Sequence, residues 1–325
     1  MTTPVSNLSL QLQSLNNLNT EQTNLARLNE QLASGQQYDN LTNYDPTVAH
    51  NLMSFQNNIT QRQAYLASIQ TVQTRLTIYD QTMNDMESIT SSASSLAASN
   101  QSLDPTKVSE LQSQVQSYMK QVTANLNQQV GGRYIYAGTR YSTSPVIDLS
   151  TLTTAPAWPF SPQTSPSLPN YDSGFSAPGP TNDATAYTKD SVTIDTAFSV
   201  QYGVTSTDPA FQQLVAGLQF MNAATQSGVS AATFQTDMAH ANSLLTTALN
   251  SLQTLHSAVA DNQNTLKTET DTQNTDISNL QGQLSDLQHV NITEVGTEIN
   301  VLQSQLQASY SATASLEQLS ILKYL

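Results

Sequence analysis

Apolar residues recur at helical spacing along both ends of the chain. Near the N-terminus the intervals are three, four and seven residues, through Leu8, Leu12, Leu15, Leu18, Leu25, Leu28 and Leu32. Residues at these intervals lie on one face of a helix, and the other faces carry mostly Gln, Asn, Ser and Thr. The pattern predicts an amphipathic helix that ends near Ser34, with Gly35 as its stop.

The C-terminal end repeats this rhythm through Ile292, Val295, Ile299, Leu302, Leu306, Leu316, Leu319 and Leu322. A stripe this narrow needs a partner, because a buried leucine contributes roughly 1.5–3 kcal/mol only once it is covered. We therefore expect residues 1–35 and 290–325 to pair as a coiled-coil domain. The stripes lack the flanking charge pairs that make an isolated coiled coil self-sufficient. This favours further burial against neighbouring copies, with a purely intramolecular coiled coil as the alternative.

The predicted assembly interface therefore lies on the two terminal helices. It comprises Leu8, Leu12, Leu15, Leu18, Leu25, Leu28, Leu32, Ile299, Leu302, Leu306, Leu316, Leu319 and Leu322.

Three Asp-Pro pairs are typical helix starts, since aspartate caps the first turn and proline tolerates the first helical position. Asp45-Pro46 predicts a helix that runs to about Ala98. Asp104-Pro105 predicts a second helix, ended by Gly131-Gly132 and folded back against the first. Asp208-Pro209 predicts a third. The last third of the chain is helical in pattern, except that Thr268–Asn274 lacks strong apolar residues and predicts an exposed or hinge-like turn.

Residues 141–207 differ from the rest of the chain. Nine of the twelve prolines lie between Pro145 and Pro209, which excludes long helices there. The even positions Val192, Ile194, Phe198, Val200 and Tyr202 are apolar, an alternation typical of a strand.

Together these patterns predict a mainly α fold: a long antiparallel helical bundle with paired terminal helices and a central β-rich or irregular insert. Residues 36–140 and 208–289 are expected to form the helical rod domain, and residues 141–207 the outer insert.

Composition excludes several classes of function. The formal net charge is −14 and no cluster of Lys or Arg occurs, which argues against nucleic-acid binding. Without cysteines there is no disulfide and no Cys-ligated metal or redox centre. No stretch approaches the roughly 18 apolar residues of a membrane span, so we expect no membrane insertion. The N-terminus lacks the basic and apolar regions of a cleaved signal peptide, so any export must use a signal-less route.

The titratable residues do not form a recognisable site. His50, His240, His256 and His289 lack ligand spacing and are expected to be surface residues of helices. Capping accounts for the three aspartates that precede prolines. The sequence therefore predicts no enzyme, no cofactor and no metal.

Four short motifs resemble those of a known family. Leu32-Ala33-Ser34-Gly35 is similar to the turn that closes the first terminal helix of the flagellin superfamily. Asp45-Pro46, the run from Gly132 to Thr139 (GRYIYAGT) and the ending from Leu319 to Leu325 (LSILKYL) resemble its hook-associated junction proteins, the hook-associated protein 3 group. Two stretches depart from the family pattern: Gln36 and Gln37 replace basic residues, and Asn291–Val295 replaces an acidic run.

In the GRYIYAGT motif the residues singled out are Arg133, Tyr134, Tyr136 and Gly138. Their aromatic side chains could form a binding platform. We favour the alternative that they belong to a strand or turn packed on the helical bundle.

The resemblance implies a structural subunit that assembles as a ring at the junction between hook and filament. The implied partners are further copies of the chain, another hook-associated protein, flagellin, and an export chaperone at the C-terminal helix. The implied location is the extracellular flagellum, reached by type III export. The alternatives are flagellin itself, which would form filaments, and an unrelated coiled-coil scaffold such as a phage tail component. An adhesive or enzymatic role for the insert is a further alternative, but nothing in residues 141–209 supplies a recognisable site for it.

Overall fold

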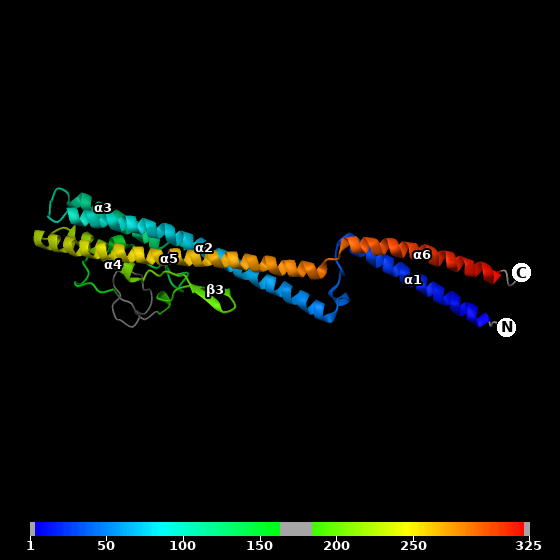
Figure 1. Cartoon of the computed structure of the whole chain (residues 1–325). Coiled ribbons are helices and arrows are strands. Elements are labelled where there is room, and N and C mark those ends of the chain that lie inside the picture. The colour runs from blue at the N-terminus through cyan, green and yellow to red at the C-terminus, as the bar shows by residue number, and fades with distance from the viewer. Residues whose placement is uncertain (1–3, 163–183, 322–325) are drawn as a thin grey trace. The chain divides into compact units, whose positions relative to one another are not determined.

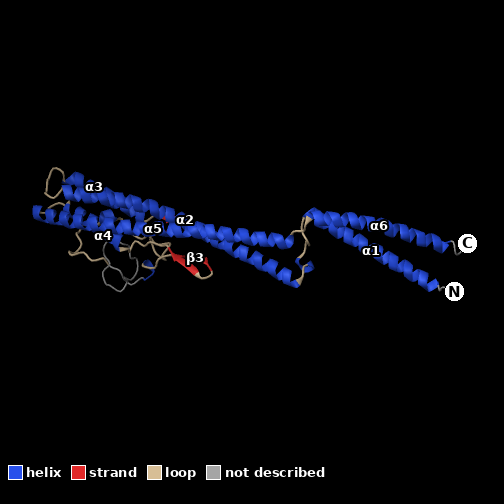
Figure 2. Ribbon diagram, in the orientation of Figure 1, coloured by secondary structure: helices blue, strands red, loops and turns tan. Residues whose placement is uncertain are grey.

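The computed structural model describes residues 4–162 and 184–321, and these are mainly helical (Figure 2). Its longer helices are α1 (Pro4–Ser34), α2 (Pro46–Ser99), α3 (Val108–Leu126), α4 (Pro209–Ala224), α5 (Ala231–Gln288) and α6 (Ile292–Ile321). Short 3-10 turns occur at Leu41–Asn43, Leu149–Thr151 and Ala184–Ala186. The strands are β1 (Gln129–Val130), β2 (Arg133–Tyr134), β3 (Ser191–Asp195) and β4 (Phe198–Gln201).

The chain forms two compact units. The terminal unit comprises residues 1–61 and 275–325, and the central unit comprises residues 62–274. The predicted three-part division into coiled coil, rod and insert stays a prediction.

In the terminal unit, α1 and α6 pair antiparallel, so that α1 begins where α6 ends (Figure 1). Gly35 closes α1 as predicted: its φ is +69° and its N–H donates to the Gln31 carbonyl at 2.8 Å. A left-handed residue at this position is the usual glycine cap of a helix. The Gly35 carbonyl then accepts from Val290 N at 3.1 Å, which joins the end of α1 to the start of the α6 segment.

The core of the central unit is built around α4. This helix is buried along almost its whole length, and its buried polar side chains Gln212, Gln219 and Asn222 each donate to a backbone carbonyl. It packs with α2, α3 and α5 in one hydrophobic cluster that runs from Ile69 to Ala97 in α2 and from Phe234 to Leu266 in α5. Figure 1 shows α3 folded back along α2, in agreement with the predicted antiparallel pair.

Two of the three Asp-Pro helix starts are confirmed. Asp45 Oδ1 accepts from Thr47 N at 2.9 Å at the start of α2, and Asp208 Oδ1 accepts from Ala210 N at 3.2 Å at the start of α4. The third was wrong by three residues, since α3 begins at Val108. Asp104 does cap a turn, accepting from both the backbone N and the hydroxyl of Thr106, but residues 105–107 form this turn outside the helix.

The prediction that Gly131-Gly132 ends a helix was also wrong. The helix α3 already ends at Leu126, and the glycines join β1 to β2, which pair antiparallel through Val130 and Arg133. Their φ values are +60° and +76°. Two adjacent left-handed residues are what a two-residue hairpin turn requires, and glycine adopts that conformation without strain.

The alternation between Val192 and Tyr202, which predicted strand, corresponds to two strands. β3 and β4 pair as an antiparallel hairpin that turns after Asp195, whose carboxylate accepts from Thr196 N at 2.6 Å. Ile194 and Val200 are buried, whereas Phe198 is 49% exposed beside the turn. Apolar residues occupy even positions both before and after the turn, so the sequence pattern did not show that a turn separates two strands.

The expected hinge at Thr268–Asn274 does not exist, because α5 runs through it without interruption. No glycine or proline breaks the segment, and the polar side chain of Gln273 is fully buried with partners. Gln273 Nε2 donates to the Ile194 carbonyl at 3.1 Å, and its Oε1 accepts from Arg62 at 2.7 Å. A polar residue thus makes a core contact between α5, α2 and the β3–β4 hairpin.

Candidate assembly interface

Part of the predicted leucine face forms the seam between α1 and α6. Leu28 of α1 packs against Val295 and Ile299 of α6, and all three are buried. Leu18 and Leu306 are buried as well, and Leu25 and Leu302 are partly buried against the same cluster. These side chains therefore hold the two terminal helices of a single chain together.

Polar side chains continue the seam toward the chain ends. Ser14 and Thr313 hydroxyls lie 2.8 Å apart, Gln22 Nε2 donates to the Tyr310 hydroxyl at 2.6 Å, and Ser309 donates to Glu21 at 3.4 Å. A typical hydrogen bond contributes only about 0.5–1.5 kcal/mol net, so this part of the pair is weakly held.

Three further residues of the predicted face are uncovered in the single chain. Leu12 is 54% exposed, Leu15 50% and Leu32 40%. The structure adds three more exposed apolar side chains on α6, which were absent from the predicted interface: Ile292, Val301 and Tyr310. We call these six residues the exposed apolar set. All six residues lie on the two paired terminal helices. Contiguous exposed apolar patches are typical of protein interaction sites.

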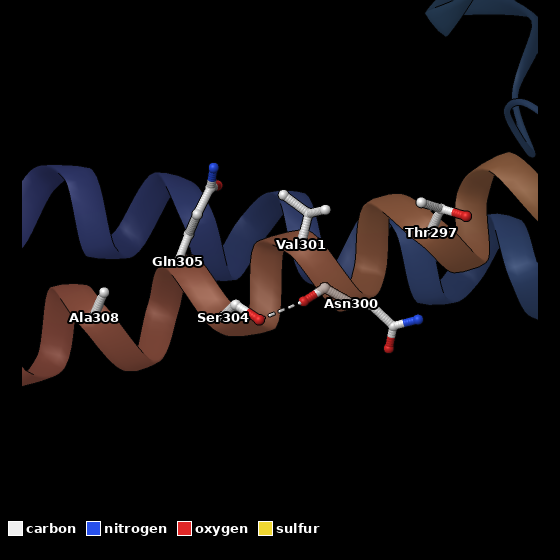
Figure 3. A pocket seen from close by; sticks show the side chains of 6 residues that line it. All are labelled: Thr297, Asn300, Val301, Ser304, Gln305 and Ala308. Atoms are coloured by element: carbon white, nitrogen blue, oxygen red, sulfur yellow. Dashed lines mark hydrogen bonds between the residues drawn. The ribbon is translucent and has the colours of Figure 1, made fainter.

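A shallow groove surrounds Val301. Residues on successive turns of α6 line this groove. Figure 3 shows Val301 between Thr297 and Gln305. A second hollow of about 390 Å³ shares Thr297, Val301 and Gln305 with this groove and reaches Asn24 and Arg27 of α1. The sequence pattern missed Val301 because it does not fit the three-and-four spacing of the seam. Val301 is exposed because of the way α1 and α6 pack against each other, which the sequence pattern alone does not show.

The structure does not describe four of the predicted interface side chains. The side chains of Leu8, Leu316 and Leu319, and Leu322 as a whole, lie outside the described residues.

The GRYIYAGT motif lies in the central unit and has a packing role. Tyr136 is fully buried, with its ring edge-on to Tyr79 at 5.0 Å and to Phe211 at 5.4 Å. Its hydroxyl lies 2.6 Å from that of Thr82, and burial raises its pKa well above the usual range. A side chain this enclosed is not an exposed aromatic platform.

The other motif residues fix the backbone around Tyr136. Arg133 and Tyr134 form β2, and the Arg133 guanidinium lies 3.3 Å above the centre of the Tyr141 ring. Gly138 has a φ of +63°, and a Cβ there would lie 2.5 Å from the Thr185 carbonyl oxygen. Only glycine fits this close approach.

The expectation that all four histidines are plain surface residues was wrong for two of them. His240 stacks on Trp158 with ring centroids 3.8 Å apart and an angle of 9°. His256 contacts two carboxylates of α2, Asp80 and Glu87. Neither cluster resembles a metal site, and the described part of the chain contains no group of three or more potential ligands placed to hold an ion.

Among the described residues, no helix is both long and apolar enough to cross a membrane.

Comparison with known proteins bears directly on this helical arrangement. Residues 243–325, which include all of α6, match the family model of the bacterial flagellin C-terminal helical region. A solved structure of a candidate flagellar hook-associated protein from Vibrio parahaemolyticus superposes with a TM-score of 0.58. The chain has a flagellin-like fold. The superposition covers 76% of this chain and 100% of the other, at 12% identity. No curated protein shows significant sequence similarity to the chain.

The flagellin-type region includes half of the candidate interface. The seam residues Val295, Ile299 and Leu306 lie within residues 243–325, as do the exposed Val301 and Tyr310. The matched region therefore carries the exposed apolar side chains of α6, whereas Leu12, Leu15 and Leu32 of α1 lie outside it.

Proposed function

We propose that this chain is a structural subunit of the bacterial flagellum that joins hook to filament, a protein of the hook-associated protein 3 type. The observation that carries the proposal is the half-covered terminal helix pair. One part of its leucine face is buried between α1 and α6, while the exposed apolar set remains open. The flagellin-type match of residues 243–325 supports a flagellar setting for this surface.

The occupant of the exposed apolar set is a second copy of this chain. Leu12 and Leu15 lie on α1 and Val301 lies on α6, so each subunit presents apolar side chains on both helices of the pair. Burial of apolar surface gains roughly 25 cal/mol per Å², which rewards close packing of such pairs side by side. Few charged groups interrupt the terminal helices, so little desolvation opposes this packing.

Assembly and ordering of the pair are coupled in this proposal. Helices with narrow apolar stripes depend on tertiary packing for their stability, and the weak polar end of the seam around Ser14 and Thr313 gains cover only from neighbours. The terminal pairs would line the inner tube as a ring, the central helices would form the stiff wall, and residues 141–207 would face solvent.

The remaining partners follow from the same family resemblance. Another hook-associated protein would lie beneath the ring and flagellin above it. An export chaperone would bind the C-terminal helix before secretion by the flagellar type III apparatus, without signal cleavage. The working location is extracellular, at the junction of hook and filament. This role needs no catalysis.

A filament subunit is the second candidate function. It is favoured by the matched family model, which describes flagellin itself. A filament subunit polymerises into long filaments, whereas a junction protein forms a limited ring.

Deletion of the gene in the source bacterium distinguishes the two. The junction role predicts complete hooks without filaments, with flagellin shed into the medium, and recovery when the wild-type gene is restored. Missing or altered filaments with no other flagellin shed would instead identify a filament subunit. Unchanged flagella and motility would contradict both functions.

A further inference from the structure

His256 of α5 lies between two carboxylates of α2 in the central unit. Its Nδ1 is 2.8 Å from Glu87 Oε1, and its Nε2 is 2.9 Å from Asp80 Oδ1. Asp80 and Glu87 are seven residues apart, which places them on one face of α2 two turns from each other. The side chains of His256 and Glu87 are 18% and 20% exposed, and that of Asp80 is 41% exposed.

This geometry defines the protonation state of the ring. An ionised carboxylate can only accept hydrogen bonds, whereas a neutral imidazole has one N–H donor and one lone pair. A ring that binds carboxylate oxygens through both nitrogens must donate from both. The arrangement therefore fits an imidazolium held by two charge-assisted hydrogen bonds.

We propose that His256 is a protonation-dependent clasp that fastens α5 to α2 and loosens the central unit as the pH rises. When the ring loses a proton, one nitrogen presents its lone pair to a carboxylate oxygen. That contact turns from attractive to repulsive, and only one of the two hydrogen bonds survives. Since Asp80 and Glu87 belong to one helix and His256 to another, the loss falls on the packing between the helices.

The charge environment agrees with this geometry. Burial lowers the pKa of His256, but the hydrogen bonds to Asp80 and Glu87 and the charge of both carboxylates raise the pKa by more. The net pKa lies above the usual value, and among the described residues these two carboxylates are the charged groups that act on the ring. A raised folded-state pKa stabilises the fold fully below the unfolded value of about 6.5, and this stabilisation disappears as pH rises through the folded-state pKa.

The test compares the full-length chain with His256→Gln by thermal unfolding at a series of pH values from 5 to 9, with NMR titration of the histidine rings in the wild type. His50→Gln is the matched control, because His50 is an exposed histidine of α2. We expect the difference in Tm between wild type and His256→Gln to shrink by about 2–4 °C between low and high pH, the shift that corresponds to roughly 1 kcal/mol in a unit of this size. The His50→Gln curve should follow the wild type throughout.

Two results would overturn the clasp. One is an identical pH dependence of Tm in wild type and His256→Gln. The other is a His256 ring that titrates at or below the ordinary histidine value. Should His256→Gln fail to fold, Glu87→Gln replaces it: the proposal requires a lowered titration midpoint of His256 in that variant, and an unchanged midpoint would contradict it.

Discussion

The hydroxyls of Ser14 and Thr313 lie 2.8 Å apart although 299 positions separate them in the sequence. This contact fixes the antiparallel register of α1 and α6 far from the connection between Gly35 and Val290. It is also polar, and the neighbouring Leu12 and Leu15 are exposed. Buried leucines such as Leu18 and Leu28 therefore alternate along α1 with exposed ones such as Leu15 and Leu32.

Replacing Leu28 with alanine should loosen the terminal pair within the single chain. Leu28 is 4% exposed and packs on Val295 and Ile299, and such buried truncations cost about 2–5 kcal/mol. Hydrogen exchange of the α6 amides in the monomer measures the effect, with faster exchange expected. Leu15→Ala is the matched control, since Leu15 is half exposed and its truncation should leave exchange unchanged. Equal exchange in the two variants would contradict the seam.

Replacing Tyr79 with phenylalanine should destabilise the central unit by about 1–3 kcal/mol, the penalty for leaving buried polar groups without partners. The buried Tyr79 hydroxyl donates to the Ile135 carbonyl and lies 3.2 Å from that of Val204. Urea unfolding followed by the fluorescence of Trp158, the single tryptophan, reports the change. Tyr118→Phe removes a hydroxyl whose bond with Gln114 is exposed, and should change stability little. A Tyr79→Phe midpoint equal to that of Tyr118→Phe would show that the buried bonds contribute nothing.

Two glycine-to-alanine substitutions should change the stability of the fold in opposite directions. A Cβ at Gly217 of α4 would lie 2.7 Å from Leu245 Cγ, so Gly217→Ala overpacks the contact with α5 and should destabilise by about 1–3 kcal/mol. A Cβ at Gly282 of α5 meets no atom within 4 Å, so Gly282→Ala should stabilise the helix by about 0.5–1 kcal/mol. Thermal unfolding by circular dichroism checks both. A stabilised Gly217→Ala would mean that α4 and α5 pack less closely than described.

Local patterns predicted the helices well, since caps and periodic leucines act over a few residues. Asp45 and Asp208 open their helices through bonds to amides two positions on, and Gly35 closes α1 through its own positive φ. The family model and the superposition support the same mainly helical fold. The prediction was wrong where one sequence feature is compatible with two structures. The Gly131-Gly132 pair is equally typical of the end of a helix and of a hairpin turn.

Other features depend on partners distant in the sequence. From the sequence, the polar stretch around Gln273 is expected to be exposed. In the structure Gln273 is buried, because Ile194 and Arg62 provide its hydrogen-bond partners. The carboxylates that contact His256 are 176 and 169 positions away. In the same way, Val301 became an interface candidate only once the packed pair left it uncovered. No spacing rule along one helix reports these relationships.

The central claim is that the exposed leucines of the terminal pair bind neighbouring copies at the flagellar junction. The direct measurement is to restore the deleted gene as wild type, as Leu12→Gln/Leu15→Gln, or as Phe198→Gln, and to quantify each protein on purified hooks and in the medium. Phe198 is the control because it is equally exposed but lies on β4 of the central unit. We predict that wild type and Phe198→Gln remain on hooks and restore filaments, whereas the double variant is secreted into the medium without attaching. A double variant that stays on hooks and restores filaments as well as wild type would contradict the account.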